Sequence, residues 1–452
     1  MLNDEIFKAN DIRGVVAGER PEWDVEGARR LGAAFVELTG ADALVLGRDM
    51  RQMGEELAEA FTDGARRAGC DVTVLGLTST DQLWYASGAS HLPGVQFTAS
   101  HNPVEYNGVK FCLSDARPVP PDFMTRLRDL APAVDLTRPV TGNRTTRDSL
   151  PGYVERLHSL VPVRGERRIR CVVDAGNGMA GHTVLPVLEP RDVEVLGLYL
   201  DLDGSFPNHP ANPLEPANLV DARRAVVDQA ADLGLVFDGD ADRCFIIDEL
   251  GEVVDPSVIT AMIADAELER EPGAAIVVNT ITSRCVDDVV AGRGELVRSR
   301  VGHTYVKALM AEHDGVFGGE HSAHYYFRDF WSADTGMLAA LHVLEHVRAG
   351  EPLSELARRY GGYVRSGELN SRVADVPAAL GRVARAFEGR GEQSRPDGLM
   401  IETPDWWVNL RPSNTEPLLR LNVEARDEAT MAALRDEVLG LVRTGTDPHG
   451  MA

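Results

Sequence analysis

The strongest chemical signal in the sequence is a loop with alternating carboxylates, Asp238-Gly239-Asp240-Ala241-Asp242-Arg243. In extended backbone, a spacing of two residues would place the carboxylates on one side of the chain. Neighbouring carboxylates repel one another, so the group needs a cation, and hard oxygen ligands favour Mg²⁺, Mn²⁺ or Ca²⁺. A solvated acidic turn and a calcium-binding EF-hand loop are the alternatives. Glu249 falls at the last EF-hand ligand position, but Arg243 replaces the glycine that such a loop requires. We therefore predict a Mg²⁺ site that leaves positions free for phosphate oxygens.

A serine in Thr98-Ala99-Ser100-His101-Asn102-Pro103 is the candidate group carrier. The apolar run 94–97 before it predicts the end of a buried strand, and the residue before proline is pushed out of helical geometry, so the chain turns there. A serine at such a corner is exposed and rigidly placed, as a residue that gives or receives a group must be. An ordinary surface turn is the alternative, because serine, asparagine and proline are common in turns.

Two further loops complete the set. The stretch 318–324 carries Glu320, Ser322 and His324 at alternate positions, which suits the vicinal hydroxyls of a sugar, although the histidine could equally pack under the aromatic residues that follow. The stretch 411–417, Arg-Pro-Ser-Asn-Thr-Glu-Pro, can enclose a phosphate, with a proline-bounded hairpin loop as the alternative. A phosphatase would need only a serine, a metal and a water. A loop that binds sugar hydroxyls (318–324) and a separate loop that binds a phosphate (411–417, the phosphate clamp) instead suit an enzyme that moves a phosphoryl group between the two ends of one sugar.

An internal repeat supplies the strands that position these loops. A strand–helix–strand pattern begins at 43–47, at 169–174 and at 274–279. Uninterrupted apolar runs predict parallel strands that are buried on both faces. Further apolar strands, at 95–97, 233–237 and 315–317, lead directly into the serine, acidic and sugar loops. Because ligands lie beyond the carboxyl ends of the strands in open α/β sheets, three such domains would bring the three loops to one cleft.

The chain is expected to form four domains. The polar stretch 133–150 and the glycines at 361, 362 and 367 are typical of linkers. Alternating strands at 408–410 and 419–423 indicate a smaller α+β unit at the end of the chain. The predicted domains are three similar α/β domains with mixed or parallel sheets, at 1–140, 150–247 and 248–362, and an α+β domain at 368–452.

Composition narrows the class of protein. With 46 basic and 70 acidic residues, the net charge of −24 argues against nucleic acid or an anionic membrane as partner. No apolar run approaches the roughly 18 residues of a membrane helix, and no signal-peptide pattern is visible. The five cysteines are scattered and make no C-x-x-C pair, which is typical of buried thiols in a reducing compartment. We expect a cytoplasmic protein that binds a small anionic substrate through local clusters of cations.

In order and spacing, the four loops resemble those of the α-D-phosphohexomutase superfamily, over the whole chain. The loop 411–417 is similar to that of the bacterial phosphomannomutase/phosphoglucomutase branch, whereas phosphoglucosamine mutases usually have Ser-Gly-Thr there. The resemblance implies a four-domain, heart-shaped fold around a central cleft. It also implies an intramolecular phosphotransferase that interconverts hexose 6-phosphate and hexose 1-phosphate through a phosphoserine and a bisphosphorylated sugar. Mannose is the expected sugar, with the glucose pair also accepted.

The same resemblance implies roles for individual residues. Ser100 would carry the phosphoryl group and join Asp238, Asp240 and Asp242 around one Mg²⁺, with hexose 1,6-bisphosphate as activator. The charged groups expected beside the phosphoserine are Arg13, His101, Lys110 and Arg243. The residues expected to contact substrate are Glu320 and Ser322 on the sugar hydroxyls, His303 and His324 along the cleft in proton-transfer roles, and Arg411, Ser413, Asn414 and Thr415 on the phosphate.

Two departures from the family pattern leave the sugar preference open. Asn10 stands where many relatives have tyrosine, and the stretch 280–283 lacks a lysine that some relatives use against the sugar phosphate. Phosphoglucosamine mutase and a metal-dependent sugar phosphatase that uses Ser100 are the alternative enzymes, and a sugar-phosphate sensor is the non-catalytic alternative. The expected partners are small hexose phosphates, and the chain is expected to be a monomer or a dimer.

Overall fold

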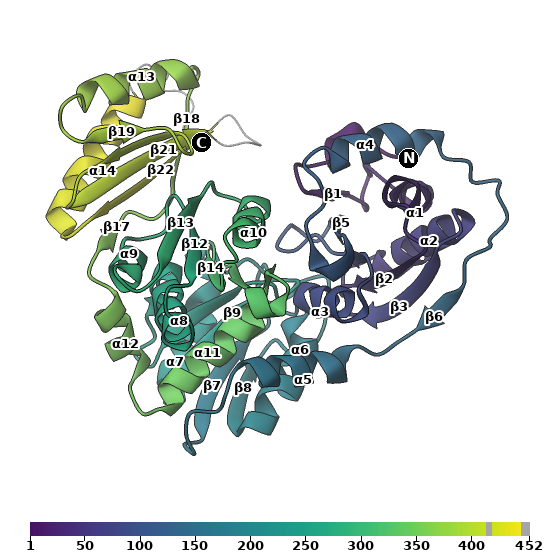
Figure 1. Cartoon of the computed structure of the whole chain (residues 1–452), viewed down its shortest axis with the longest axis horizontal. Coiled ribbons are helices and arrows are strands. Elements are labelled where there is room, and N and C mark those ends of the chain that lie inside the picture. The colour runs from purple at the N-terminus through teal and green to yellow at the C-terminus, as the bar shows by residue number, and fades with distance from the viewer. Residues whose placement is uncertain (413–417, 444–452) are drawn as a thin grey trace.

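The computed structural model describes residues 1–412 and 418–443, which form three α/β domains followed by a smaller C-terminal domain (Figure 1). The outline is that of a heart, with the N-terminal and C-terminal domains as its two lobes and the second and third domains between them. This is the fold class predicted from the sequence. Among the described residues, no helix is long and apolar enough to cross a membrane.

The first domain has a mixed sheet covered by helices. Its elements are β1 (Asp11–Val15), α1 (Val25–Thr39), β2 (Ala43–Arg48), α2 (Gly54–Arg67), β3 (Asp71–Leu77), α3 (Thr80–Ser90), β4 (Gly94–Phe97), β5 (Tyr106–Cys112), α4 (Phe123–Leu130) and β6 (Arg144–Thr146), with short 3-10 helices at Asp4–Ile6, Ser114–Ala116 and Ala131–Ala133. The strand order is β1-β5-β4-β2-β3-β6. The final strand, β6, lies in the polar stretch that was predicted to be a linker, and it pairs with β3 at the sheet edge.

The second domain repeats this plan. Its elements are α5 (Leu150–Leu160), β7 (Ile169–Asp174), α6 (Ala180–Leu188), β8 (Val193–Leu198), α7 (Val220–Asp228), β9 (Leu233–Phe237), β10 (Cys244–Asp248) and β11 (Val253–Val254), with short 3-10 helices at Glu189–Arg191 and Pro216–Leu219. The strand order is β11-β10-β9-β7-β8. Because β11 pairs with β10, the sheet takes in residues beyond the predicted boundary at 247.

The third domain follows the same plan once more. Its elements are α8 (Pro256–Arg270), β12 (Ala275–Asn279), α9 (Cys285–Val290), β13 (Glu295–Ser299), α10 (His303–Glu312), β14 (Phe317–Gly319), β15 (Tyr325–Phe327), β16 (Ala333–Asp334), α11 (Gly336–Arg348) and α12 (Leu353–Tyr360), with a 3-10 helix at Arg328–Phe330. The strand order is β13-β12-β14-β15-β16.

The three sheets place the three predicted loops at equivalent points. In each sheet the first strand of the repeat is parallel to the second strand on one side and to the loop-bearing strand on the other; the central pairs are β2–β4, β7–β9 and β12–β14. The loop-bearing strand then turns into an antiparallel partner, β5, β10 or β15. The serine, acidic and sugar loops are therefore the turns of three equivalent hairpins, which the uniform apolar runs did not predict.

Two local expectations differ from the structure. The strand expected at 315–317 is β14, two residues later, where a Cβ on Gly319 would lie 2.3 Å from Thr260 Oγ1; glycine there lets α8 pack closely on the strand. The acidic and sugar loops are tight turns rather than extended backbone, with Ala241 at φ 61° and Ala323 at φ 64°. Alanine has no preference for this left-handed conformation, so the sequence held no signal for it.

The C-terminal domain is an antiparallel sheet with two helices. Its elements are β17 (Val364–Arg365), β18 (Leu369–Arg372), α13 (Val376–Ala386), β19 (Glu392–Ser394), β20 (Leu399–Glu402), β21 (Trp406–Pro412), β22 (Leu418–Ala425) and α14 (Glu428–Arg443). The main strand order is β17-β22-β21-β20-β19, and β18 also pairs with β22.

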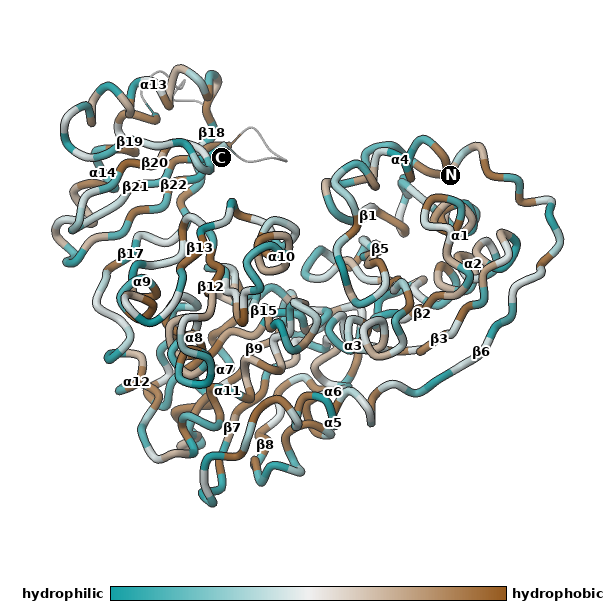
Figure 2. Tube along the Cα trace, in the orientation of Figure 1, coloured by the Kyte–Doolittle hydropathy of each residue, from teal (hydrophilic) through white to brown (hydrophobic). Residues whose placement is uncertain are grey.

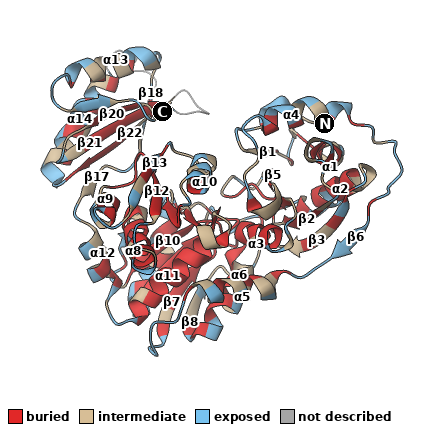
Figure 3. Cartoon of the chain, viewed as in Figure 1, coloured by how far each residue is buried: buried red, intermediate tan, exposed pale blue. Residues whose placement is uncertain are grey.

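The cores show which domains are fused. One large apolar cluster joins the second and third domains and takes in Leu83 and Trp84 of α3 from the first. The C-terminal domain has a cluster of its own, built around residues such as Val383, Phe387 and Leu421. Figures 2 and 3 show the same distribution, with apolar and buried segments densest in the sheets of the second and third domains. The second and third domains therefore share a continuous core that reaches α3, whereas most of the first domain and the C-terminal domain each have a core of their own.

Candidate active site

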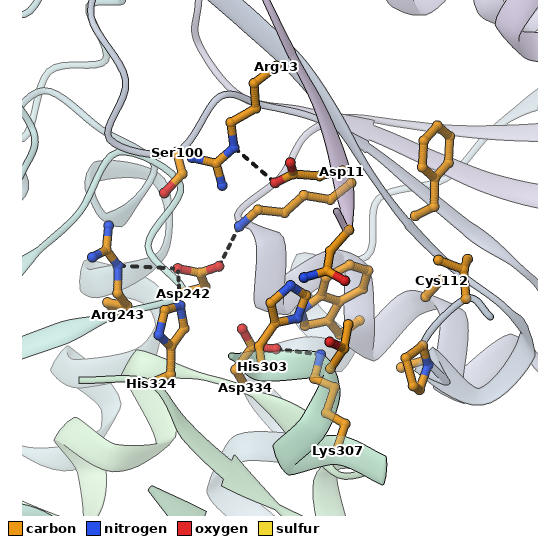
Figure 4. Close-up of a pocket in the computed structure, with 18 of the residues that line it drawn as sticks. Asp11, Arg13, Ser100, Cys112, Asp242, Arg243, His303, Lys307, His324 and Asp334 are labelled. Atoms are coloured by element: carbon orange, nitrogen blue, oxygen red, sulfur yellow. Dashed lines mark hydrogen bonds and ion pairs between the residues drawn. The ribbon is translucent and has the colours of Figure 1, made fainter. Parts of the chain in front are cut away.

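The serine loop and the acidic loop meet directly, although they are 138 positions apart. The Ser100 hydroxyl donates a hydrogen bond of 2.9 Å to Asp238 Oδ2. Gly239 makes this approach possible, because a Cβ there would lie 2.4 Å from the Ser100 carbonyl oxygen. Figure 4 shows Ser100, Asp242 and Arg243 gathered on one side of the pocket. Two of the three loops that were expected to converge therefore meet here.

A buried arginine that the sequence analysis missed holds the serine loop. Arg51 donates hydrogen bonds to the carbonyl oxygens of Ser100 at 2.7 Å, Asn102 at 2.6 Å, Pro103 at 2.9 Å and Tyr106 at 3.0 Å. Ser100 has a φ of 50°, a conformation that costs energy for a residue with a side chain and persists only when its surroundings hold it. The only signal for this role was the position of Arg51 just after β2, at the same sheet edge as the loop.

The three aspartates form a buried cluster that fits a divalent cation. One oxygen from each of Asp238, Asp240 and Asp242 lies within 4.8 Å of the others. Asp240 Oδ1 and Asp242 Oδ1 are buried and accept no hydrogen bond from the described residues. Unpartnered buried carboxylate oxygens are costly unless an ion satisfies them, and three oxygen ligands suit Mg²⁺. The EF-hand alternative fails, because Glu249 bonds to Ser354 instead.

Lysine and arginine compensate this negative charge. Lys110 Nζ lies 2.6 Å from Asp240 Oδ2 and 2.5 Å from Asp242 Oδ2, and Arg243 Nη2 donates to Asp238 Oδ2 at 2.7 Å. Burial would lower the pKa of Lys110, but the two aspartates outweigh it and raise this pKa. Burial and the charge of Asp240 raise the pKa of Asp242 to about 6. The cluster therefore carries its own counter-cations.

Arg13 and His101 stand beside Ser100, as expected. Arg13 donates to Asn102 Oδ1 at 2.8 Å and to Asp11 Oδ2 at 2.9 Å. His101 Nδ1 lies 3.1 Å from Ser100 Oγ and 2.6 Å from Arg243 Nη2. Because Arg243 can only donate, this ring nitrogen accepts. Burial and the neighbouring arginines hold the pKa of His101 well below its usual value, so the ring is neutral.

The third domain supplies the opposite wall of the pocket (Figure 4). His303 and His324 both line it, together with Lys307, which the sequence analysis did not assign to the site. Burial is the main cause that lowers the pKa of each histidine to about 4. Lys307 pairs with Asp334 at 2.6 Å and lies 4.9 Å from the ring centre of Trp84. Asp242, His324 and Asp334 also cluster, but Asp334, the second carboxylate of this group, pairs with Lys307.

The sugar loop is shaped by its own carboxylate. Glu320 is buried and accepts hydrogen bonds from Tyr326 at 2.8 Å, from Asn279 at 3.2 Å and from the Gly302 backbone at 3.1 Å. Ser322 Oγ lies 3.0 Å from His324 Nδ1 on the cavity side of the loop. Glu320 thus anchors the loop as well as lining the cavity.

A second cavity extends from these residues to the C-terminal domain. It has a volume of about 620 Å³ and shares His303 and His324 with the serine pocket. Its far wall carries Arg411, which pairs with Glu368 at 2.6 Å, and Arg420, which pairs with the same carboxylate at 3.0 Å. The predicted phosphate ligands Ser413, Asn414 and Thr415 lie outside the described residues.

Comparison with known proteins assigns the chain to a family. Models of phosphoglucomutase/phosphomannomutase match domain I at residues 4–138, domain II at 151–251, domain III at 255–363 and the C-terminal domain at 368–441. The chain belongs to the phosphoglucomutase/phosphomannomutase family. It is 39% identical to a phosphomannomutase of Salmonella montevideo, covering 98% of this chain and 100% of that one, and 36% identical to a phosphomannomutase of Vibrio cholerae, covering 97% of each.

Solved structures agree with this assignment. A phosphoglucomutase/phosphomannomutase family protein from Burkholderia thailandensis superposes with a TM-score of 0.88 at 31% identity, covering 99% of each chain. A putative phosphomannomutase from Thermus thermophilus superposes with a TM-score of 0.82 at 22% identity, covering 97% of this chain and 98% of that one. The second likeness is one of fold alone.

For a member of this metal-dependent family, the arrangement separates two tasks. The serine pocket combines the Ser100 hydroxyl, the acidic cluster, and the hydrogen-bonded side chains of His101, Lys110 and Arg243, with Arg13 bonded to Asn102 on the same loop as Ser100. The larger cavity combines hydroxyl and imidazole groups with arginines on its far wall. The serine pocket can transfer a phosphoryl group, because cationic side chains around the Ser100 hydroxyl can stabilise the negative charge of that group. The larger cavity can hold a sugar that carries a phosphate at its other end.

Proposed function

We propose that the protein is a phosphohexomutase that interconverts mannose 6-phosphate and mannose 1-phosphate and also accepts the glucose pair. The observation that carries this proposal is the 2.9 Å hydrogen bond between Ser100 Oγ and Asp238, beside a pocket that shares His303 and His324 with the cavity whose far wall holds Arg411. Curated relatives named phosphomannomutase, 36–40% identical over nearly the whole chain, support the choice of mannose.

In the proposed reaction, Ser100 carries a phosphoryl group and gives it to the free hydroxyl of a bound hexose phosphate. The bond between phosphorus and Ser100 Oγ breaks as the bond to the sugar oxygen forms. His324 takes the proton of the attacking hydroxyl, and Ser100 Oγ keeps the bonding electron pair among the surrounding cations. Burial lowers the pKa of His324 to about 4, so the ring is neutral and one of its nitrogens can accept a proton. The bisphosphate then turns over in the cavity and returns its other phosphoryl group to Ser100.

The groups around Ser100 stabilise the charge of the transferring phosphoryl group. Arg13, His101, Lys110 and Arg243 approach it from the first and second domains. Asp238, Asp240 and Asp242 would hold one Mg²⁺, which neutralises phosphoryl charge when bound. Hexose 1,6-bisphosphate would prime the serine as activator.

The rest of the site would hold the substrate while its other end reacts. Glu320, Ser322 and His303 face the sugar, and Arg411 binds the phosphate that stays, together with Ser413, Asn414 and Thr415. The proposal includes a cytoplasmic location, which the five free, buried cysteines support. A monomer or dimer remains the prediction for its assembly.

The test is a Ser100→Ala variant assayed with mannose 1-phosphate, glucose 1-phosphate and glucosamine 1-phosphate in the presence of hexose 1,6-bisphosphate. Loss of at least about 10⁴-fold in mutase turnover is expected, because the group carrier is gone. Ser159→Ala, at an exposed serine, is the matched control. Full turnover by the Ser100→Ala variant would end the proposal.

The same assay separates the alternatives. Inorganic phosphate released as fast as substrate disappears would indicate a phosphatase, and preference for glucosamine 1-phosphate would indicate a phosphoglucosamine mutase. Mass spectrometry of the purified protein should find a phosphate on Ser100 after incubation with the bisphosphate.

A further inference from the structure

The start of α3 touches the acidic loop from another domain. The hydroxyl of Thr80, the first residue of α3, donates to Asp240 Oδ2 at 2.5 Å. The backbone N–H of Thr80 donates to the carbonyl oxygen of Asp240 at 3.0 Å. Both residues are fully buried. Thr80 of the first domain therefore forms hydrogen bonds with both the side chain and the backbone of Asp240 in the second domain.

These contacts determine how the Asp240 carboxylate is turned. Its Oδ2 accepts from both Thr80 and Lys110, whereas its buried Oδ1 accepts nothing from the described residues. A carboxylate is planar, so a donor fixed on one oxygen directs the other. Lys110 is a flexible ammonium that also bonds to Asp242, so Thr80 is the donor with a fixed position.

The start of α3 is itself fastened to all three α/β domains. Asp81, the next residue, accepts hydrogen bonds from Tyr153 of the second domain at 2.6 Å and from Thr335 of the third at 2.7 Å. The Ser79 hydroxyl, at the N-cap of α3, donates to the same carboxylate. Figure 1 shows α3 at the point where the N-terminal domain meets the centre of the molecule. Thr80 therefore lies at a helix start that hydrogen bonds hold in place against the second and third domains.

We propose that Thr80 is a positioning residue for the metal site: its hydroxyl orients Asp240 so that the free oxygen faces the cation. This inference rests on the proposed function only in that the aspartates bind a divalent ion. Partners that orient a metal ligand typically change metal affinity or activity by about 10- to 100-fold when they are removed. A threonine that merely joined domains would change stability and leave metal affinity alone.

The test measures Mn²⁺ binding to the full-length protein by calorimetry and by electron paramagnetic resonance, without substrate. Thr80→Val keeps the shape and removes the donor, and Thr80→Ser keeps the donor and removes a methyl group. We expect the Mn²⁺ dissociation constant to rise about 10-fold or more in Thr80→Val and to stay within about threefold of wild type in Thr80→Ser. In the mutase assay, the Mg²⁺ concentration for half-maximal rate should rise in parallel.

Thr335→Val is the matched control, because its hydroxyl belongs to the same joint but bonds to Asp81 rather than to the acidic loop. It should lower the melting temperature and leave Mn²⁺ affinity unchanged. Equal losses of affinity in Thr335→Val and Thr80→Val, or an unchanged affinity in Thr80→Val, would overturn the inference. If Thr80→Val does not fold, Thr80→Ala takes its place under the same criteria.

The outcome is separable from the proposed function. Wild-type protein that binds Mn²⁺ and is a mutase, with Thr80→Val binding equally well, contradicts only the role of Thr80. Wild-type protein that binds no Mn²⁺ contradicts the metal site and the inference together. Wild-type protein that binds Mn²⁺ with the expected dependence on Thr80, but without mutase activity, supports the inference and contradicts the proposed function.

Discussion

The centre of the molecule and its C-terminal domain hold their charged groups in opposite ways. In the centre, Asp238, Asp240 and Asp242 are buried and bonded to residues of the first two domains. In the C-terminal domain, Arg411 is also buried, but it pairs with Glu368 of the same domain and lines the larger cavity. The groups proposed for phosphoryl transfer are therefore assembled before substrate binds. In the phosphate clamp, by contrast, Arg411 is paired with Glu368, and a substrate phosphate must take the place of this carboxylate.

The connection between these regions consists of a small apolar cluster and several polar contacts, among them those of Arg284 with Glu402 and Glu424. The C-terminal domain has its own core and meets the third domain through a small cluster of Ile281, Met400 and Trp407. Arg365 of the C-terminal domain adds a 2.8 Å ion pair with Asp255 of the third domain. Two residues after Arg365, Gly367 has a φ of 66°, a left-handed conformation that glycine adopts without strain. A separate body on a short connection can adjust to either orientation of the substrate while the centre stays fixed.

The largest effect that tests this division between the two regions is expected from a change in the acidic cluster. Asp240→Asn removes one charge from the proposed cation site and should lower kcat by about 10³-fold, because the transferring group loses electrostatic stabilisation. KM for mannose 1-phosphate should change only a few-fold, since the clamp is untouched. Steady-state kinetics at saturating Mg²⁺ measure both constants. A large rise in KM with kcat preserved would contradict the division of tasks.

The complementary change is in the clamp. Arg411→Gln removes a charge-assisted pair of hydrogen bonds to the substrate phosphate and should raise KM by about 10- to 100-fold, with a smaller effect on kcat. Arg372→Gln, at an exposed arginine of the same domain, is the control and should leave KM unchanged. A loss confined to kcat would place Arg411 in the chemical step instead.

The pH dependence of His303 sharpens the picture of the centre. Burial, with the nearby Lys307 adding to it, lowers the pKa of His303 to about 4, so the ring should stay neutral from pH 8 to about pH 5. Because folding favours the neutral ring, its contribution to stability is complete above the unfolded pKa of 6.5 and is lost as the pH falls towards 4. Nitrogen-15 NMR, with His303→Gln for assignment, measures this titration. A midpoint near 6.5 would contradict it.

The smallest expected effect is that of metal removal on folding. Lys110 and Arg243 already pair with the aspartates, so chelation should abolish mutase activity yet shift the melting temperature by only a few degrees. Differential scanning calorimetry with and without a chelator measures the shift. Unfolding on chelation would mean that the cation, rather than these side chains, holds the centre together.

What could be predicted from the sequence was local. The loops around Ser100, Asp240 and Glu320 follow apolar strands, and both the strands and the residue types are visible in short windows. Their meeting point followed from the rule that ligands lie at the carboxyl ends of such strands. Arg51 and Thr80 were not predictable, because their roles depend on partners 49 to 160 positions away. Neither carries a local pattern that differs from an ordinary arginine or helix-starting threonine.

Position 239 has a consequence for changing the specificity of the enzyme. The serine and acidic loops approach so closely at Gly239 that one added methyl group would drive them apart. Asn10, by contrast, lies on the wall of the pocket that Ser100 lines. A mutant library aimed at new sugars can include residue 10, but a single alanine at 239 would separate Ser100 from the aspartates proposed to hold the metal, whatever the sugar. At position 239, tolerance to substitution is therefore set by the distance between the two loops rather than by the distance from the substrate.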